Sequence, residues 1–387
     1  MRSLIFFSLV LGLLMNISGI ASARHMHLQK QAELAAEVKT SQVNAEKLMK
    51  PWPVETMDTG GVLLFSDSPE YVRTYGILYS DVVRGEARVF YYHVNAAGRP
   101  GKLAVVLENT GQNPVQVTVR RAGMPAPDTN YFRVGKACQT SYFGDAQSEK
   151  KIRLRAGGRQ LLNPQMGQRL LAPRQLGSGM YDFFTTEPVR VSVVFCPENS
   201  NPVNFVRAAR VLPRDKEALR GTFTGMNRLI RAKWPYDPQQ DGWVYIPLGD
   251  NVYDRYKHGV DATDGSPVVN YGNYGILYRV EVPTWGRELT QVRLSPLGGV
   301  YAGAVRVAVN QQENRLVQTP AGLLYFGGEN RDNLVPVMGK KVALTHAFEL
   351  ADIGVFAAYR HFAVEYSPPG ASNMPVLLIM GPAEQKR

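Results

Sequence analysis

The sequence has few of the residues from which common catalytic and metal sites are built. It contains six histidines and two cysteines among 387 residues. None of the motifs Gly-x-Ser-x-Gly, His-Glu-x-x-His, Cys-x-x-Cys and Gly-x-x-x-x-Gly-Lys occurs. These absences exclude the usual signatures of α/β-hydrolases, zinc proteases, thioredoxin-like proteins and P-loop enzymes. The sequence therefore predicts no catalytic residue and no cofactor, and we interpret the chain as a non-enzyme.

Long apolar runs are also scarce. The run from Leu4 to Met15 follows a single Arg2 and precedes the small residues Ala21-Ser22-Ala23, which is typical of a secretory signal peptide over residues 1–23. This run is shorter than the roughly 18 residues of a membrane span, and no later run is longer, so no transmembrane segment is expected after signal removal. No cysteine lies near the cleavage site, which excludes a lipoprotein. We expect an exported protein of the medium, the cell wall or the periplasm.

Acidic residues are outnumbered by basic ones, 33 against 44, and the formal net charge is +11. The signal peptide carries one arginine and no acid, so its removal would leave +10. A basic surface favours acidic partners, and we expect an anionic cell-envelope polymer or an envelope protein. The cations are scattered, without a dense basic run or a nucleic-acid motif, so nucleic acid is not an expected partner.

One pentapeptide occurs twice. Tyr75–Tyr79 and Tyr274–Tyr278 both read Tyr-Gly-Ile-Leu-Tyr, and three further pairs of similar segments follow in the same order. The separation falls from 199 residues at the pentapeptides to 169 between Pro213 and Pro382. Two related domains, the first with about thirty extra residues, would produce this pattern.

Short runs of β-branched and aromatic residues alternate with Gly, Pro and Asn over most of the chain. Val89–Asn95 and Leu103–Leu107 flank a Gly-Arg-Pro-Gly turn and predict a hairpin. Val115–Val119 and Val189–Val193 alternate with period two, which is typical of strands with one buried face. The predicted fold is all-β, with tandem Ig-like β-sandwich domains.

The predicted domain organisation has four parts. Apolar residues at helical spacing predict an amphipathic helix over residues 28–49, which either self-associates or packs on the first domain. A charged, glycine-free joint at residues 214–220 separates the repeats. The parts are the signal peptide 1–23, an N-terminal helical segment 24–53, a first β-sandwich repeat 54–214 and a second β-sandwich repeat 219–383.

Cys138 and Cys196 both fall in the first repeat, 58 residues apart. In an oxidising compartment they could form a disulfide, which for this loop length would contribute roughly 3–4 kcal/mol. We predict this disulfide; the alternative is two separate buried thiols. His93 lies in a strand-like run, where a lone histidine is more often structural than a ligand.

Two further groups of residues are candidates for binding. The carboxylates of Asp250, Asp254, Asp261 and Asp264 lie in a turn-rich segment and are weak candidates for Ca²⁺ ligands, although Asx-turns give the same composition without a metal. Three tryptophans could stack on sugars if they are exposed, or pack in the core if they are not. They are Trp234, Trp243 and Trp285.

Two segments of the second repeat carry a resemblance to a known family. Asp261–Tyr278 and Leu294–Ala304 resemble secreted, functionally uncharacterised proteins of Bacillota-type bacteria that are labelled copper amine oxidase-like or stalk-domain-containing. The resemblance covers about residues 55 to 383 and implies export. An amine oxidase requires a Thr-x-x-Asn-Tyr motif whose tyrosine becomes the quinone, and the threonine is missing at Tyr131, Tyr271 and Tyr274. Amine oxidase activity is therefore not expected.

These observations favour an exported, non-catalytic protein with a binding or structural role in the cell envelope. Two alternatives stay open. Exposed tryptophans on one concave face would favour a pair of carbohydrate-binding modules. A cluster of histidines or carboxylates inside the fold would favour a copper-dependent or hydrolytic enzyme whose site is assembled from scattered residues.

Overall fold

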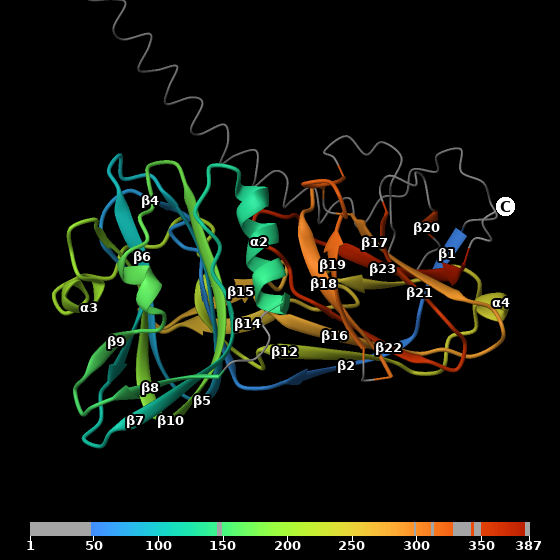
Figure 1. Ribbon diagram of the computed structural model, residues 1–387, viewed down its shortest axis with the longest axis horizontal. Helices are drawn as coiled ribbons and strands as arrows, with labels where there is room; N and C mark the ends of the chain where they lie inside the picture. Colours follow the sequence, from blue (N-terminus) through green and yellow to red (C-terminus); the bar gives the residue numbers. More distant parts are fainter. Residues whose placement is uncertain are drawn as a thin grey trace, which may run out of the picture.

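A computed structural model describes residues 48–144, 149–297, 299–310, 313–327, 342–343 and 350–383. The described part is mostly β-structure, as the sequence predicts, and its strands form one sheet of eleven strands and two sheets of six (Figure 1). Its helices are short, and none of the described ones is long and apolar enough to cross a membrane. They are α2 (Tyr131–Gly144), α3 (Pro202–Phe205), α4 (Pro238–Asp241) and the 3-10 helix η2 (Pro164–Gly167).

The predicted signal peptide 1–23 lies outside the described residues, and so does most of the predicted helix 28–49. The last two residues of that helix, Leu48 and Met49, belong instead to strand β1, so the helix prediction is wrong there. Strand β1 pairs in parallel with β13, and the buried Met49 packs against Tyr245. Tertiary packing at this position outweighs the local helical pattern.

Two six-stranded sheets face each other and form the two-sheet unit. In β16, buried and partly exposed residues alternate along the strand, because only one face of the sheet meets the core. The first sheet contains, in spatial order, β20 (Val342–Ala343), β1 (Leu48–Pro51), β13 (Val244–Leu248), β23 (Val376–Pro382), β17 (Thr290–Pro296) and β21 (Ala351–Phe356). The second contains β19 (Glu313–Thr319), β18 (Gly303–Val309), β22 (His361–Tyr366), β16 (Leu277–Pro283), β12 (Asn227–Ala232) and β2 (Val54–Thr59).

The third sheet forms the eleven-stranded unit. Its main path is β15 (Ser266–Asn270), β14 (Lys257–Asp261), β11 (Arg220–Thr224), β3 (Val62–Ser66), β5 (Gly76–Asn95), β10 (Leu176–Pro197), β6 (Gly101–Asn109) and β9 (Arg159–Leu161). Off this path, β4 (Tyr71–Val72) pairs with β5, β7 (Val115–Gly123) pairs with β10, and β8 (Lys150–Leu154) pairs with β7.

Two long antiparallel strands organise this sheet. Strands β5 and β10 have 20 and 22 residues and pair along most of their length. The register shifts between Thr185 and Val189, and the two halves of β10 then pair with different strands, β7 and β6. A bulge bends a strand. Buried residues of β6 and β7 accordingly share one core, so the sheet folds over on itself.

The predicted hairpin of Val89–Asn95 and Leu103–Leu107 is wrong. Both segments are strands, within β5 and β6, but they do not pair with each other. Strand β10 lies between them, with Val193 opposite both Tyr79 and Val105. A short turn between two strands predicts that they pair with each other. Here β10, from far along the chain, lies between them instead.

Strand pairing crosses the boundary predicted at residues 214–220 in both directions. Strand β2, from before the boundary, pairs with β12 of the two-sheet unit. Strand β11, from after it, pairs with β3 of the eleven-stranded unit. The two units are therefore joined by exchanged strands as well as by the connecting chain.

A continuous core and helix α2 connect the two units. Leu63, Phe90 and Met180 of the eleven-stranded unit belong to the same apolar cluster as Tyr278 and Tyr366 of the two-sheet unit. Figure 1 shows α2 between the units. An apolar junction of this kind disfavours relative motion of the units.

Buried hydrogen bonds fix α2 in this position. The Lys136 ammonium donates to the carbonyls of Pro320 and Leu323, both at 2.6 Å. The Gln139 amide oxygen accepts from the backbone N–H of Ala304 at 2.9 Å. Because α2 belongs to the first half of the chain and these partners to the second, the helix holds the two units together.

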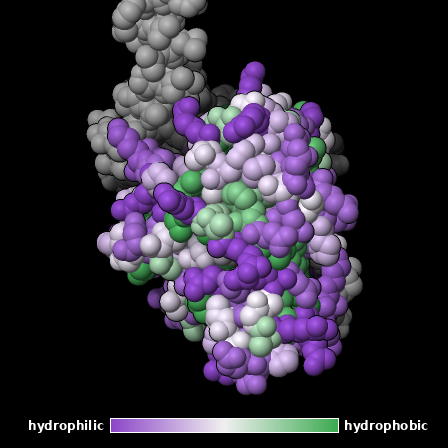
Figure 2. Space-filling model, turned by 90° about the vertical axis from the view of Figure 1, so that its left-hand side faces the viewer, coloured by the Kyte–Doolittle hydropathy of each residue, from purple (hydrophilic) through white to green (hydrophobic). Residues whose placement is uncertain are grey.

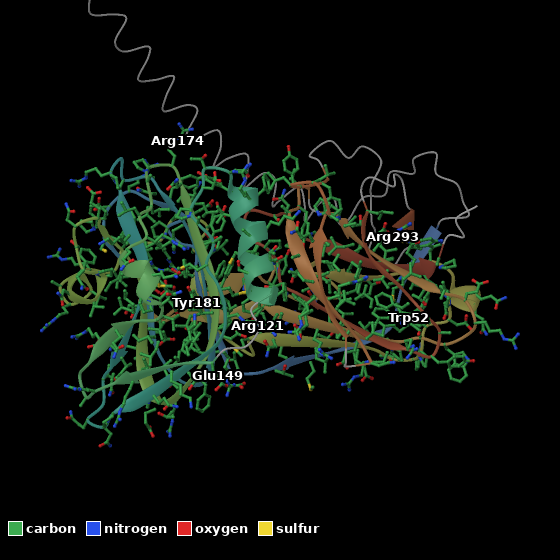
Figure 3. All side chains as sticks on the ribbon, in the orientation of Figure 1. Trp52, Arg121, Glu149, Arg174, Tyr181 and Arg293 are labelled. Carbon is green, nitrogen blue, oxygen red and sulfur yellow. The ribbon has the colours of Figure 1, made fainter. Side chains whose placement is uncertain are left out.

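A fully buried arginine also crosses the junction. The Arg88 guanidinium donates to both carboxylate oxygens of Asp182, at 2.6 and 2.8 Å, and to the carbonyl of Met226 at 2.6 Å. The Tyr142 hydroxyl donates to Asp182 at 2.8 Å. Figure 3 shows Arg121 at the same junction, where it pairs with Glu365 at 3.5 Å. These ion pairs give the junction a defined geometry, since a buried charge needs its partner in place.

Candidate functional site

The four predicted carboxylate candidates do not form one site. Asp254 forms an ion pair with the Arg228 guanidinium and accepts from the Tyr278 hydroxyl at 2.6 Å. Asp261 pairs with Arg220 at 2.7 Å, and both side chains are buried. The described residues contain no group of three His, Cys, Asp or Glu side chains that could hold a metal ion.

The other two carboxylates organise loops. Asp250 Oδ1 accepts backbone N–H groups of Val252, Tyr253 and Asp254 at 2.8–3.1 Å. Asp264 Oδ1 accepts the backbone N–H of Ser266 at 2.9 Å. These are the contacts expected of the Asx-turn alternative.

Asp250 has a second feature that loop capping does not explain. Its Oδ2 is buried and has no hydrogen-bond partner among the described residues. Burial raises the pKa of this carboxyl from 3.8 to about 6, because the charged form loses its hydration. The group is therefore sensitive to mild acid, although it lies in no metal cluster.

The predicted disulfide between Cys138 and Cys196 is not formed: both cysteines are free and buried. Cys138 lies on α2, in the apolar junction of the two units, and its thiol donates to the carbonyl of Gly123 at 3.5 Å. Cys196 lies on β10 beside β6. The structure therefore shows the alternative of two separate buried thiols. Sequence spacing cannot distinguish this case from a bridge, because it does not determine which core each cysteine enters.

The three tryptophan candidates have different environments. Trp234 and Trp285 are 57% and 55% exposed. The Trp285 ring makes an edge contact with the exposed ring of Tyr359, with centroids 4.8 Å apart. Trp243 instead packs beside a small apolar cluster, under the guanidinium of Arg293. Trp234 and Trp285 are thus available to a ligand, and Trp243 is largely occupied by the fold.

His93 forms a pair with Ser66 that resembles a base and a nucleophile. Ser66 Oγ lies 2.9 Å from His93 Nε2, and His93 Nδ1 lies 2.9 Å from the carbonyl oxygen of Pro69. Both side chains are fully buried. Burial lowers the pKa of His93 to about 4, because it disfavours the imidazolium. A substrate cannot reach this pair, so His93 is a hydrogen-bonded structural residue, as the sequence predicts.

Strand β8 carries the densest group of exposed cations that we identify. Ile152 and Leu154 pack toward the core, Lys151 and Arg153 alternate with them toward solvent, and Lys150 is exposed at the start of the strand. No ion pair joins these basic side chains to a described residue. The group, called here the basic edge, consists of Lys150, Lys151, Arg153 and Arg155.

The basic edge lies at a free edge of the eleven-stranded unit. Among the described strands, β8 pairs only with β7. On the outer face of β7, Gln116 lies opposite Arg153 and Thr118 opposite Lys151. Arg120 lies on the same face, where it pairs with Glu86 at 2.9 Å and approaches Glu149 at 3.9 Å. Figure 3 shows Glu149 beside β7 and β8, at the margin of this surface.

Other arginines differ from the basic edge in their role. Arg88, Arg220 and Arg228 are buried and paired with aspartates, so their charges stabilise the fold. The end of the eleven-stranded unit that faces away from the two-sheet unit is mostly hydrophilic, with a small apolar area near its centre (Figure 2). The basic side chains of β8, by contrast, are exposed and form no ion pair with a described residue, so their charge is available to a partner.

Sequence reasoning missed the basic edge. The run Lys-Lys-Ile-Arg-Leu-Arg contains four cations in six residues, but two apolar residues interrupt it. The signal was the alternation of Lys151, Arg153 and Arg155 with Ile152 and Leu154, because a strand places alternate residues on one face. A search for contiguous basic residues does not detect that arrangement.

Comparisons with known proteins do not identify a family. No protein-family description matches the chain, and no curated protein does. Solved structures give weak similarities. PNGF-II is 9% identical over 86% of this chain and 66% of its own (TM-score 0.17), so this chain spans about two thirds of its length.

Two further structures are equally distant. A formate complex of Lactobacillus farciminis oxalate decarboxylase is 9% identical over 89% of each chain (TM-score 0.15). The coconut allergen cocosin is 12% identical over 88% of this chain and 86% of its own (TM-score 0.16). TM-scores this low support no argument about fold or function.

Proposed function

We propose that the protein is an exported, non-catalytic component of the cell envelope that binds an anionic polymer through the basic edge. The observation that carries this proposal is a group of four exposed cations on edge strand β8 and directly after it, without an ion pair to any described residue. Flexible polyanions bind such groups through many weak contacts. The apolar junction with its buried ion pairs supports the structural part of the role, because it keeps both units in one orientation.

Charged residues on an edge strand have another known effect. They prevent the free edge from pairing with a strand of a second molecule. The test must therefore separate polymer binding from self-association, and the oligomeric state of every variant has to be measured.

The test is retention of the protein without residues 1–23 on isolated envelopes over a salt gradient. The Debye length falls from about 10 Å at 0.1 M to about 3 Å at 1 M salt, so retention should fall steeply. A variant with glutamine at all four positions of the basic edge should bind about tenfold more weakly at 0.1 M. The matched control replaces four exposed cations elsewhere by glutamine: Lys216, Lys233, Arg207 and Arg287.

Each outcome has a defined meaning. Equal losses in both variants would show that net charge, and not the basic edge, determines binding. Retention that is unchanged at 1 M salt would refute the electrostatic proposal. Peroxide release from benzylamine by copper-loaded protein would refute the non-catalytic proposal.

A carbohydrate-binding role is the second candidate. The exposed pair of Trp285 and Tyr359 favours it, since aromatic faces stack on sugar rings. Stacking is insensitive to salt, so this role predicts retention at 1 M that is lost in the Trp285→Ala variant.

We also propose that residues 54–214 and 219–383 are diverged copies of one Ig-like sandwich. The two pentapeptides support this, because Gly76 begins β5 and Leu277 begins β16, and each strand pairs with a later antiparallel strand. Superposition of residues 54–214 on 219–383 tests the proposal. Pentapeptides that fall on non-equivalent strands would refute it.

A further inference from the structure

A cavity lies between the two sheets of the two-sheet unit, at the edge that β19 and β21 form. These are the end strands of their respective sheets. The cavity has a volume of about 300 Å³. Val307 and Phe356, which are buried, form part of its wall, and Arg315 and Arg360 line it with their longer side chains.

Arg315 crosses the gap between the sheets. Its Nη2 donates to the carbonyl of Ile353 on β21 at 2.5 Å, although the arginine itself belongs to β19. Gly354 makes room for this contact, because a Cβ atom built there would lie 2.4 Å from Arg315 Nη2. The guanidinium is therefore held at the cavity by two strands.

Arg360 adds a second positive charge. Its backbone is fixed by Thr284, whose Oγ1 accepts the Arg360 N–H at 3.1 Å and donates to the Arg360 carbonyl at 2.9 Å. Its side chain forms no hydrogen bond or ion pair with a described residue. No aspartate or glutamate of the described part lines the cavity. Two arginines thus line a cavity that also has valine and phenylalanine in its wall, and none of its described lining residues is acidic.

We propose that this cavity binds a small monocarboxylate with an apolar chain. Guanidinium groups form charge-assisted hydrogen bonds with a carboxylate, and the valine and phenylalanine side chains exclude water from the rest of the ligand. The volume equals that of about ten water molecules, which corresponds to a carboxylate with a chain of about eight carbons. This inference goes beyond the proposed envelope binding and does not depend on the basic edge.

The test is calorimetric titration of the protein with octanoate, with octan-1-ol and inorganic phosphate as comparison ligands. Octanoate is expected to bind at one site per chain, at least tenfold more tightly than octanol or phosphate, because only octanoate uses both the charges and the apolar wall. Arg360→Gln should weaken octanoate binding about tenfold. The matched control is Arg287→Gln, an exposed arginine outside the cavity, which should leave the affinity unchanged.

Two further variants test the geometry. The exposed Arg360 side chain forms no hydrogen bond or ion pair with a described residue, so its replacement should leave the fold intact, whereas Arg315→Gln is checked by thermal unfolding. Gly354→Ala keeps both charges but displaces the Arg315 guanidinium, and it should also weaken octanoate binding several-fold.

Absence of octanoate binding, equal binding of octanol, or unchanged affinity in the Arg315→Gln/Arg360→Gln double variant would overturn the proposal. Envelope retention should be unaffected by Arg360→Gln, which separates this site from the basic edge.

Discussion

Two buried groups should titrate in opposite senses between pH 4 and 6.5. The pKa of His93 is lowered from 6.5 to about 4, so above pH 4 the folded state binds fewer protons at this site than the unfolded state. Its contribution to stability is therefore complete above pH 6.5 and is lost as the pH falls toward 4. The pKa of Asp250 is raised from 3.8 to about 6, so its contribution is complete below pH 3.8 and is lost as the pH rises through 6.

The two contributions are similar in size. One pKa unit corresponds to about 1.4 kcal/mol, which gives about 3 kcal/mol for the fully buried His93. Asp250 is partly exposed, and screening by water reduces its contribution to about 2 kcal/mol. On going from pH 6.5 to 4, these two groups together should lower the free energy of unfolding of the parent protein by only about 1 kcal/mol.

Single variants should separate the contributions of His93 and Asp250 to stability. His93→Gln removes the acid-labile group, so its free energy of unfolding should rise by about 2 kcal/mol between pH 6.5 and 4. Asp250→Asn keeps the oxygen that caps the loop, and its free energy of unfolding should fall by about 3 kcal/mol from pH 6.5 to 4. Urea unfolding followed by tryptophan fluorescence at each pH gives these values, and differences between pH values cancel any change in packing. His258→Gln is the control, because this histidine is exposed. A His93→Gln protein whose stability falls in parallel with the parent would refute the reasoning.

The remaining predictions concern the junction of the units. Arg88→Met leaves the Asp182 carboxylate without its partner and should lower the free energy of unfolding in urea by about 3–5 kcal/mol. Adding Asp182→Leu should recover most of this loss, and a double variant as unstable as Arg88→Met would contradict the prediction. Gly135→Ala should cost about 1–3 kcal/mol, because its Cβ would lie 2.1 Å from the carbonyl oxygen of Gly370. Gly144→Ala on the same helix, with its nearest contact at 3.6 Å, should be neutral or stabilising, and equal melting temperatures for the two variants would exclude the proposed clash.

The sequence predicted the strands better than their partners. Val115–Val119 and Val189–Val193 were identified from period two alone, because one buried face imposes that pattern locally, and they lie in β7 and β10. The partner of each strand depends on residues far along the chain. That is why the insertion of β10 between β5 and β6, and the pairing of β2 with β12, carry no local signal.

The candidate site shows the same limit. The exposed Trp234 and Trp285 were identified by residue type, but their exposure follows from tertiary packing. The buried Arg88 lies within a strand of ordinary composition, and nothing near it in sequence indicates Asp182 as its partner. The basic edge was predictable in principle, since the alternation of Lys151, Ile152 and Arg153 is local.

The arrangement of the two-sheet unit constrains when it can fold during synthesis. Strand β23 occupies the middle of its sheet, between β13 and β17, although its residues 376–382 are among the last described. Strands β1 and β2, the first of the described strands, pair with β13 and β12, which follow roughly 170 to 190 residues later. The two-sheet unit therefore cannot be completed until β23 has been synthesised. Until then the apolar faces of β1, β13 and β17 have no cover, so the nascent chain needs protection from aggregation that the finished protein does not need.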